Sequence, residues 1–215
     1  MNTIIKRLKN KIPQNVIGRY RTIKNILFKN RIINKWENDG YPIPPPYIVK
    51  SDTIKKYAND YKIKVFVETG TYLGDMVDAV KKIFDLIYSI ELSNDLFLKS
   101  SYRFKHYKHI NIIEGDSSKE LIKISSQIDK PAIYWLDGHY SGGITAKADK
   151  ICPIYEELEA IFNSKVSGNI ILIDDARLFN GQDDYPKIDA LINYIKKNRQ
   201  NAEIEIKYDI IRVIL

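Results

Sequence analysis

The sequence predicts an α/β protein built on a doubly wound sheet of seven strands. From residue 51 onward, short runs rich in β-branched residues alternate with longer amphipathic segments. Strands joined through helices are expected to be parallel, because a parallel pair needs a crossover connection. The last two strands are separated by so little chain that they must be antiparallel neighbours. We therefore expect a mostly parallel sheet with an antiparallel C-terminal edge strand and helices on both faces.

Each expected element follows from a local pattern. The strands share short apolar runs bounded by turn residues: 64–68, 86–91, 110–115, 132–137, 169–175, 202–208 and 210–215. The helices share an apolar face at helical spacing: 52–61, a helix from about residue 75, then 94–104, 118–128, 152–162 and 185–197. Met76, Val80 and Phe84 lie on one face of the second helix, and Ser51 is the expected cap of the first.

Composition limits the class of protein. A chain of 215 residues with 44% apolar and 28% charged residues can bury a sizeable core and is neither disordered nor membrane-spanning. No apolar run approaches the roughly 18–20 residues of a transmembrane helix. Cys152 is the only cysteine of the sequence, which excludes an internal disulfide and fits a reducing compartment. Residues 1–18 lack the apolar core of a secretory signal, so we expect a cytoplasmic protein.

The positive charge is concentrated near the N-terminus. Residues 1–50 carry eleven Lys or Arg and two acidic residues, whereas residues 51–215 carry 23 basic and 25 acidic residues. We predict a basic extension over 1–50, with a stiff proline-rich connector at 41–47, and one domain over 51–215. The extension is either a solvated segment or a contact for a nucleic acid, an anionic membrane surface or an acidic glycan. Together with the connector it could also mediate a homodimer.

The first predicted strand ends in a glycine turn. Glu68, Gly70 and Gly74 stand in "VETGTYLGD", where glycines let the backbone approach a ligand closely. The spacing Gly-x-x-x-Gly differs from the Gly-x-Gly-x-x-Gly of dinucleotide-binding proteins, and the turn lacks the Gly-Lys-Ser/Thr ending of a phosphate-binding loop. The sequence therefore disfavours both NAD and ATP as the ligand.

The next two strands also end in acidic residues. The second strand ends at Glu91, about twenty residues after the glycine turn, where a carboxylate can accept hydrogen bonds from two ribose hydroxyls. The third strand is followed by Asp116 and Ser117. Taken alone, Asp116 is more simply explained as a helix cap. Three consecutive strands with acidic ends favour a binding site at the carboxyl edge of the sheet.

The sequence resembles the class I S-adenosylmethionine-dependent methyltransferases. The resemblance covers residues 51–215 and rests on "VETGTYLGD", "SIELS", "EGDSS", "YWLDGH" and "LIDDAR" in the expected order. It implies a Rossmann-like domain in which Glu68 and Gly70 line the methionine end of the cofactor, Glu91 holds the ribose, and Asp116 with Ser117 lies beside the adenine. The implied cofactor-binding residues are Glu68, Thr69, Gly70, Thr71, Gly74, Glu91, Asp116, Ser117 and Asp137. The glycine that is common in the middle of the family's turn is absent here.

The fourth and fifth strands end in Asp137 and in the pair Asp174 and Asp175. Neighbouring parallel strands would bring these three carboxylates together, and like charges at close range need a cation or a proton. Oxygen ligands suit a hard ion such as Mg²⁺. The arrangement resembles the metal-dependent O-methyltransferases of catechols and macrolide sugars, which implies that Asp137, Asp174 and Asp175 bind a metal.

His139 and Asp137 are the predicted catalytic residues. A neutral imidazole can accept the proton of an acceptor hydroxyl as the methyl group arrives, although His139 could instead hydrogen-bond a loop or bind the metal. Arg177, just after the acidic pair, could balance the charge of that pair or contact an anionic substrate. The loop 140–145 could close over the acceptor.

We therefore predict a methyltransferase that uses S-adenosylmethionine, with Mg²⁺ or a similar ion, to methylate a hydroxyl of a small acceptor. A sugar or sugar nucleotide of a surface-polysaccharide or natural-product pathway is the first choice. Methylation of RNA or of another acceptor is the alternative among enzymes, and a non-catalytic nucleotide-binding protein of the same fold is the alternative outside them. The 15 tyrosines are scattered and form no base-stacking platform, so nucleic acid is not the expected partner.

Overall fold

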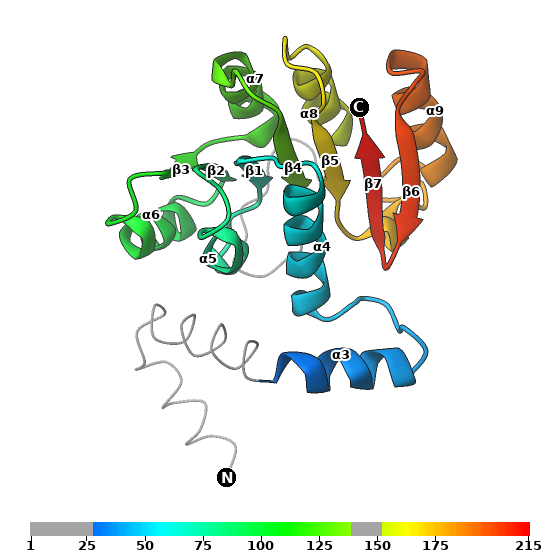
Figure 1. Ribbon diagram of the computed structural model, residues 1–215. Helices are drawn as coiled ribbons and strands as arrows, with labels where there is room; N and C mark the ends of the chain where they lie inside the picture. The colour runs from blue at the N-terminus through cyan, green and yellow to red at the C-terminus, as the bar shows by residue number, and fades with distance from the viewer. Residues whose placement is uncertain (1–27, 139–151) are drawn as a thin grey trace.

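The computed structural model describes residues 28–138 and 152–215, and these form one seven-stranded sheet with helices on both sides (Figure 1). The strands are β1 (Val65–Thr69), β2 (Leu86–Glu91), β3 (Ile110–Glu114), β4 (Ala132–Leu136), β5 (Ile170–Ile173), β6 (Glu203–Lys207) and β7 (Ile210–Ile214). Their spatial order is β3-β2-β1-β4-β5-β7-β6. The pairs among β1 to β5 are parallel, and β7 runs antiparallel to both β5 and β6. The predicted fold class is confirmed, and the antiparallel strand β7 lies between β5 and the edge strand β6.

All but the first of the described helices divide between the two faces of the sheet. They are α3 (Lys29–Asn38), α4 (Tyr47–Asp60), α5 (Asp75–Val80), α6 (Asn94–Phe104), α7 (Ser117–Gln127), α8 (Ile154–Phe162) and α9 (Ile188–Asn198), with a 3₁₀ turn, η1 (Ala176–Leu178), after β5. The face that carries α4, α5 and α6 and the face that carries α7, α8 and α9 each bury their own apolar cluster. No helix in 28–138 or 152–215 is long and apolar enough to cross a membrane.

Alternation along the strands supplies both clusters. In β1, Val65 and Val67 pack with the α7, α8 and α9 cluster, whereas Phe66 between them packs with the α4, α5 and α6 cluster. All five residues of β1 are buried, as expected for a central parallel strand covered on both faces. Full burial of a side chain of this size contributes roughly 1.5–3 kcal/mol to folding. The two cores therefore fix the sheet, and the sheet fixes the loops at its carboxyl edge.

The first helix of the predicted domain begins earlier than the sequence indicated. The prediction that Ser51 caps this helix is wrong, because α4 begins at Tyr47, directly after Pro46. Ser51 is buried inside the helix, and its hydroxyl donates to the Ile48 carbonyl oxygen at 3.1 Å. Pro46 directly precedes the first helical residue, and the fixed φ of a proline suits the start of a helix. Lys50, which the charge count assigned to the extension, is thus part of the same helix as residues 51–60.

The helix after the glycine turn is shorter than expected. Its last residue is Val80, so Phe84 lies beyond the helix rather than on its face. Phe84 is nevertheless buried in the same cluster as Met76 and Val80, and its ring stacks on Phe66 with centroids 5.1 Å apart. The predicted contact is present, although a turn rather than a helix produces it.

The segment that contains α3 is attached to the C-terminal hairpin. The Trp36 ring makes edge contacts with Tyr41 and Tyr208 at centroid distances of 5.0 and 4.8 Å. The Trp36 indole also donates to the Pro42 carbonyl oxygen at 2.8 Å. Aromatic pairs of this geometry contribute roughly 0.5–1.5 kcal/mol beyond area burial. These contacts hold α3 against the turn between β6 and β7, and Ile48 and Val49 of α4 pack into the same cluster as Trp36.

Candidate functional site

The candidate site lies where the strand order reverses, between β1 and β4. The chain runs from β1 outward to β3 on one side and from β4 outward to β5 on the other. In open α/β sheets, ligands bind outside the carboxyl ends of the strands at this reversal. Every predicted site residue that the structure describes lies at the carboxyl end of one of the strands β1 to β5 or within five residues after it.

Gly70 joins the loop after β1 to the loop after β4. Its φ is +86°, and a Cβ atom placed there would lie 2.4 Å from the Asp137 carbonyl oxygen. Real Cβ contacts do not come so close, and L side chains rarely adopt this φ. Gly138 in turn donates its N–H to the Thr69 hydroxyl at 3.2 Å. The two loops therefore contact each other through backbone, which only glycine at position 70 permits.

Glu68 is a buried carboxyl at the end of β1. Its side chain accepts a hydrogen bond from the Ser89 hydroxyl, which also contacts the Thr71 hydroxyl at 2.6 Å. Burial raises the pKa of Glu68 to about 8, with smaller contributions from the negative charges of Glu91 and Asp75, while the Ser89 hydrogen bond opposes the shift. Glu68 thus holds a proton at neutral pH unless a cation approaches it.

Glu91 ends β2 with its carboxylate facing the β1 turn. Its two oxygens accept the backbone N–H groups of Tyr72 at 2.7 Å and Ser93 at 2.9 Å. Burial raises the pKa of Glu91, and these backbone donors oppose the rise. A carboxylate offers about four acceptor positions. Glu91 therefore keeps acceptor capacity for hydroxyl groups of a ligand.

Asp116 serves as the N-cap of α7. Its Oδ1 accepts the Ser118 N–H at 3.0 Å and the Ser118 hydroxyl at 2.7 Å. The cap explanation given for this residue alone is confirmed. Ser117 is the first residue of α7, so both residues lie at a helix N-terminus beside the loop after β4. Capping uses only Oδ1 of Asp116. The other oxygen, Oδ2, lies 3.7 Å from the ammonium group of Lys119.

Gly74 has a structural requirement of its own. Its φ is +74°, and a Cβ atom there would lie 2.5 Å from Cε2 of the Phe104 ring on α6. The glycine allows α6 to pack against the beginning of α5. This packing accounts for glycine at position 74 without reference to a ligand, and a cofactor contact by Gly74 stays a prediction.

The loops after β4 and β5 bring three carboxylates together. Asp137, Asp174 and Asp175 each have a carboxylate oxygen within 4.8 Å of those of the other two. We call these three residues the acidic cluster. Asp174 is 1% exposed, and the other two are partly exposed. The convergence predicted for these strand ends is confirmed.

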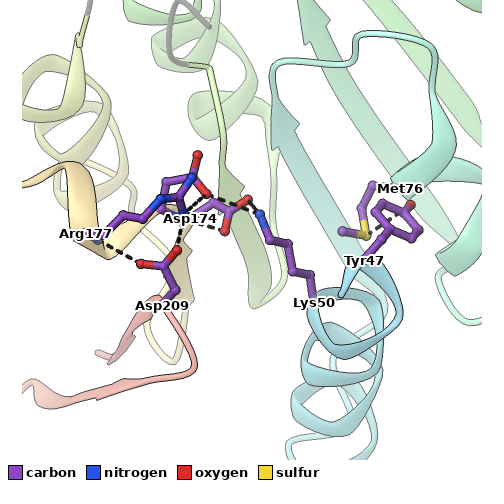
Figure 2. Close-up of polar contacts among 7 residues, drawn as sticks. Tyr47, Lys50, Met76, Asp174, Arg177 and Asp209 are labelled. Carbon is purple, nitrogen blue, oxygen red and sulfur yellow. Dashed lines mark hydrogen bonds and ion pairs between the residues drawn. The ribbon is translucent and has the colours of Figure 1, made fainter. Parts of the chain in front are cut away.

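Two basic side chains contact the acidic cluster from different parts of the chain (Figure 2). Lys50 extends from α4, and its ammonium group contacts Asp174 directly and lies 3.3 Å from Asp175 Oδ1. Arg177 contacts Asp175 at 2.9 Å and also pairs with Asp209. Of the two roles considered for Arg177, charge balance of the acidic pair is the one present in this structure.

Charge and burial shift the pKa values of the three aspartates in different directions. Burial raises the pKa of Asp137 well above its ordinary value, and the negative charge of Asp174 adds to this, whereas Lys50 opposes it. Burial likewise raises the pKa of Asp174 to about 6 against the effect of Lys50. For Asp175, burial is outweighed by Lys50 and Arg177, which lower the pKa. The negative charge is therefore compensated at Asp175 and least compensated at Asp137.

The chemistry of these donors fits a divalent ion. Carboxylate oxygens are hard ligands that suit such an ion, and three of them lie within 4.8 Å of one another here. Asp137, Asp174 and Asp175 are the residues that would hold the ion. Lys50 is the feature that this expectation did not include, because its ammonium group already contacts two of the three.

Sequence reasoning missed several residues of the site. Lys50 and Tyr47 lie one turn apart on α4. Tyr47 donates to the Met76 sulfur at 3.7 Å, and burial, together with the charge of Glu68, raises its pKa. A helix start placed after Pro46 would have put both on one face. Glu157 of α8 is fully buried beneath Gly138, and burial raises its pKa to about 7, opposed by the hydroxyls of Ser117 and Thr69.

The predicted base and the loop predicted to close over the acceptor lie outside the described residues. His139 and the loop 140–145 fall within residues 139–151, between Gly138 and Cys152. The role of His139 therefore stays a prediction from the sequence. Gly138, the last described residue before it, lies at the contact between the two loops of the site.

Solved structures with a similar fold include methyltransferases. An O-methyltransferase from Bacillus cereus in complex with SAH is 12% identical, with a TM-score of 0.55 over 86% of this chain and 90% of that one. The SAH-bound methyltransferase PaMTH1 of Podospora anserina is 17% identical, with a TM-score of 0.57 over 91% and 94%. TomG of Streptomyces achromogenes, an O-methyltransferase of tomaymycin synthesis in complex with SAM, is 13% identical, with a TM-score of 0.55 over 81% and 82%.

These likenesses define the class of fold. No protein-family model and no curated protein matches the sequence. The chain has the Rossmann-like fold of the class I S-adenosylmethionine-dependent methyltransferases, which confirms the resemblance seen in its motifs at the level of fold. Since a fold hosts more than one chemistry, the activity has to be argued from the site.

Proposed function

We propose that this protein is an S-adenosylmethionine-dependent O-methyltransferase of a small hydroxylated acceptor. The observation that carries the proposal is the backbone contact between Gly70 and Asp137. The carboxyls of Glu68 and Glu91 lie at the ends of strands on one side of this contact, and the acidic cluster lies after the strands on the other side. A cofactor on the first side and an acceptor on the second would meet at this contact.

The cofactor side suits S-adenosylmethionine. Glu91 would accept hydrogen bonds from the ribose hydroxyls, and Ser117 with the second oxygen of Asp116 would lie beside the adenine. Thr69, Gly70, Thr71 and Gly74 would line the turn beneath the methionine part. Glu68 lies at the end of β1, where the cationic methionine part would draw it into its ionised form.

The acceptor side suits a hydroxyl group. A divalent ion held by the acidic cluster would supply a Lewis acid that orients the hydroxyl and lowers its pKa. Asp137 would position the acceptor next to the cofactor side, and His139 would take the hydroxyl proton as the methyl group transfers. The basic segment over 1–50 would add affinity for a phosphate-bearing acceptor, a membrane surface or a second copy of the chain. A sugar or sugar nucleotide is the acceptor class we propose, in a cytoplasmic pathway for surface polysaccharide or a natural product.

Methyl transfer from labelled S-adenosylmethionine to a panel of acceptors tests the proposal. The panel contains sugars, sugar nucleotides, catechols and RNA, each with and without a chelator. We expect transfer to a hydroxylated small molecule, with losses of about a hundredfold or more in Asp137→Asn and Asp174→Asn. Unchanged activity in both variants and in chelator would remove the metal from the proposal.

The salt dependence of binding distinguishes RNA from a sugar as the acceptor. Binding that involves several phosphate contacts weakens steeply as salt rises, whereas binding of an uncharged sugar does not. Transfer to RNA with a steep salt dependence would replace the sugar by RNA. Binding of S-adenosylmethionine without transfer to any acceptor would favour a non-catalytic nucleotide-binding protein.

A further inference from the structure

Lys50 is placed inside the acidic cluster. Its ammonium group contacts Asp174 and lies 3.3 Å from Asp175, and the lysine side chain is only 16% exposed (Figure 2). The lysine comes from α4, far from both aspartates in sequence, and the packing of α4 against α5 and β4 fixes its position. An ammonium group in this position is part of the folded site rather than a surface charge.

The lysine and a divalent ion would use the same oxygens. An ion bound by the acidic cluster must lie among carboxylate oxygens that are all within 4.8 Å of one another. Mg²⁺ binds its oxygen ligands at about 2.0–2.1 Å. An ammonium group bonded to two of the three carboxylates would be brought next to the ion, and two cations at such a separation repel strongly. Occupation by one therefore requires displacement of the other.

Arg177 does not substitute for Lys50. It contacts Asp175 from the opposite side and divides its charge between Asp175 and Asp209. Asp174 has Lys50 as its only basic partner among the described residues. Removal of the Lys50 charge would thus free Asp174 for another cation while leaving the Arg177 contacts in place.

We propose that Lys50 is a resident counter-ion that competes with the divalent metal for the acidic cluster. The proposal rests on the metal site of the proposed function and adds a property of this chain. Without metal, the ammonium group balances the cluster and keeps it compact. When metal enters, the flexible lysine side chain leaves Asp174 and Asp175. Metal affinity is therefore weaker than the three carboxylates alone would give.

The direct test is Mn²⁺ binding, measured by calorimetry on the wild type and on Lys50→Gln, Lys50→Arg and Lys56→Gln. Lys56 lies on the same helix and pairs with Asp60 at the surface, so it is the matched control. We expect Lys50→Gln to bind Mn²⁺ about tenfold more tightly or better, and the other two variants to bind as the wild type does. Lys50→Gln combined with Asp137→Asn should bind Mn²⁺ more weakly than Lys50→Gln alone, because one of the three ligands is removed.

Each other outcome is decisive. Equal Mn²⁺ binding by the wild type and Lys50→Gln overturns the competition and leaves the metal of the proposed function intact. No Mn²⁺ binding by either protein overturns both, whereas binding by Lys50→Gln alone supports the competition. Binding of S-adenosylmethionine, measured on the same samples, reports separately on the cofactor side.

A second measurement needs no variant. Amine-reactive labelling of the folded wild type, read by peptide mass spectrometry, reports whether the Lys50 ammonium is free. We expect saturating Mn²⁺ to increase labelling of Lys50 several-fold while labelling of Lys56 stays constant. Unchanged labelling of Lys50 at saturating Mn²⁺ would overturn the displacement even if Lys50→Gln fails to fold.

Discussion

The two sides of the strand reversal hold their carboxyl groups in different ways. On the β1, β2 and β3 side, Glu68, Glu91 and Asp116 accept hydrogen bonds from hydroxyls and backbone N–H groups close to them in the fold. Of these three, only Asp116 has a basic partner among the described residues, the exposed Lys119 at 3.7 Å. On the β4 and β5 side, the acidic cluster is balanced by the charges of Lys50 and Arg177. The first side is prepared for a ligand that brings hydroxyls and positive charge. The second side already holds positive charge, which a ligand must displace or use.

The largest expected effect is at the contact between the two sides. Gly70→Ala would force a Cβ atom against the Asp137 carbonyl oxygen and impose an unfavourable φ, so we expect a loss of about 3 kcal/mol or more in stability. Gly40→Ala is the matched control, because Gly40 has φ +82° and nothing within 4 Å of its added Cβ. It should cost only about 1 kcal/mol. Urea unfolding measures both, and equal losses would mean that the two loops do not depend on this contact.

The second largest effect is the pH dependence of stability that arises from Glu68, a buried carboxyl. Because the pKa of Glu68 is raised from 4.5 to about 8, the folded state keeps a proton that the unfolded state loses, and stability falls as pH rises between these values. Relative to Glu68→Gln, the wild type should lose roughly 2–4 kcal/mol between pH 5 and pH 8. Urea unfolding at the two pH values checks this. The same pH dependence in both proteins would show that Glu68 ionises normally.

Removal of the Lys50 charge from the other side should likewise cost most stability at high pH. Lys50→Met leaves the acidic cluster without one of its positive charges, and we expect a loss of about 1–3 kcal/mol at pH 8. At pH 5 the loss should be smaller, because Asp174, with a pKa of about 6, takes up a proton. Lys56→Met on the exposed face of α4 is the control for unfolding measurements. A loss that is equal at both pH values would contradict the charge balance described here.

The smallest effect separates capping from cofactor binding. Asp116→Ala removes the N-cap of α7 and should cost about 1 kcal/mol, whereas Asp116→Ser retains a capping oxygen and should cost much less. If the second oxygen of Asp116 also contacts the adenine, both variants should bind S-adenosylmethionine more weakly than the wild type. Normal cofactor affinity in Asp116→Ser would leave the cap as the role of this residue.

The same contrast explains what the sequence could predict. Strand patterns gave the seven strands and the fold class, since alternation and turn residues are local signals. Glu68, Gly70 and Glu91 were found because each belongs to a short motif at a strand end. Lys50 was not found, because its partners are far away in sequence and its charge was counted with a basic segment.

Two further residues show the same limit. Asp209 and Glu157 enter the site through packing of β7 and α8, and nothing next to them in the sequence marks them. The Ser51 error had a specific cause, because a serine can hydrogen-bond a carbonyl inside a helix as readily as it can cap one. Local chemistry therefore predicted the groups that a strand end presents, and only the tertiary structure identified the charges that balance them.

Titration calorimetry with S-adenosylmethionine reports directly on the proposed cofactor site. We expect binding in the micromolar range, weakened about tenfold or more in Glu91→Gln, with no binding of NAD or ATP. Glu114→Gln is the control and should bind as the wild type does. Glu114 is the exposed last residue of β3, and its side chain accepts a hydrogen bond from Asn94. Failure of the wild type to bind S-adenosylmethionine, or binding that Glu91→Gln leaves unchanged, would contradict the cofactor site described here.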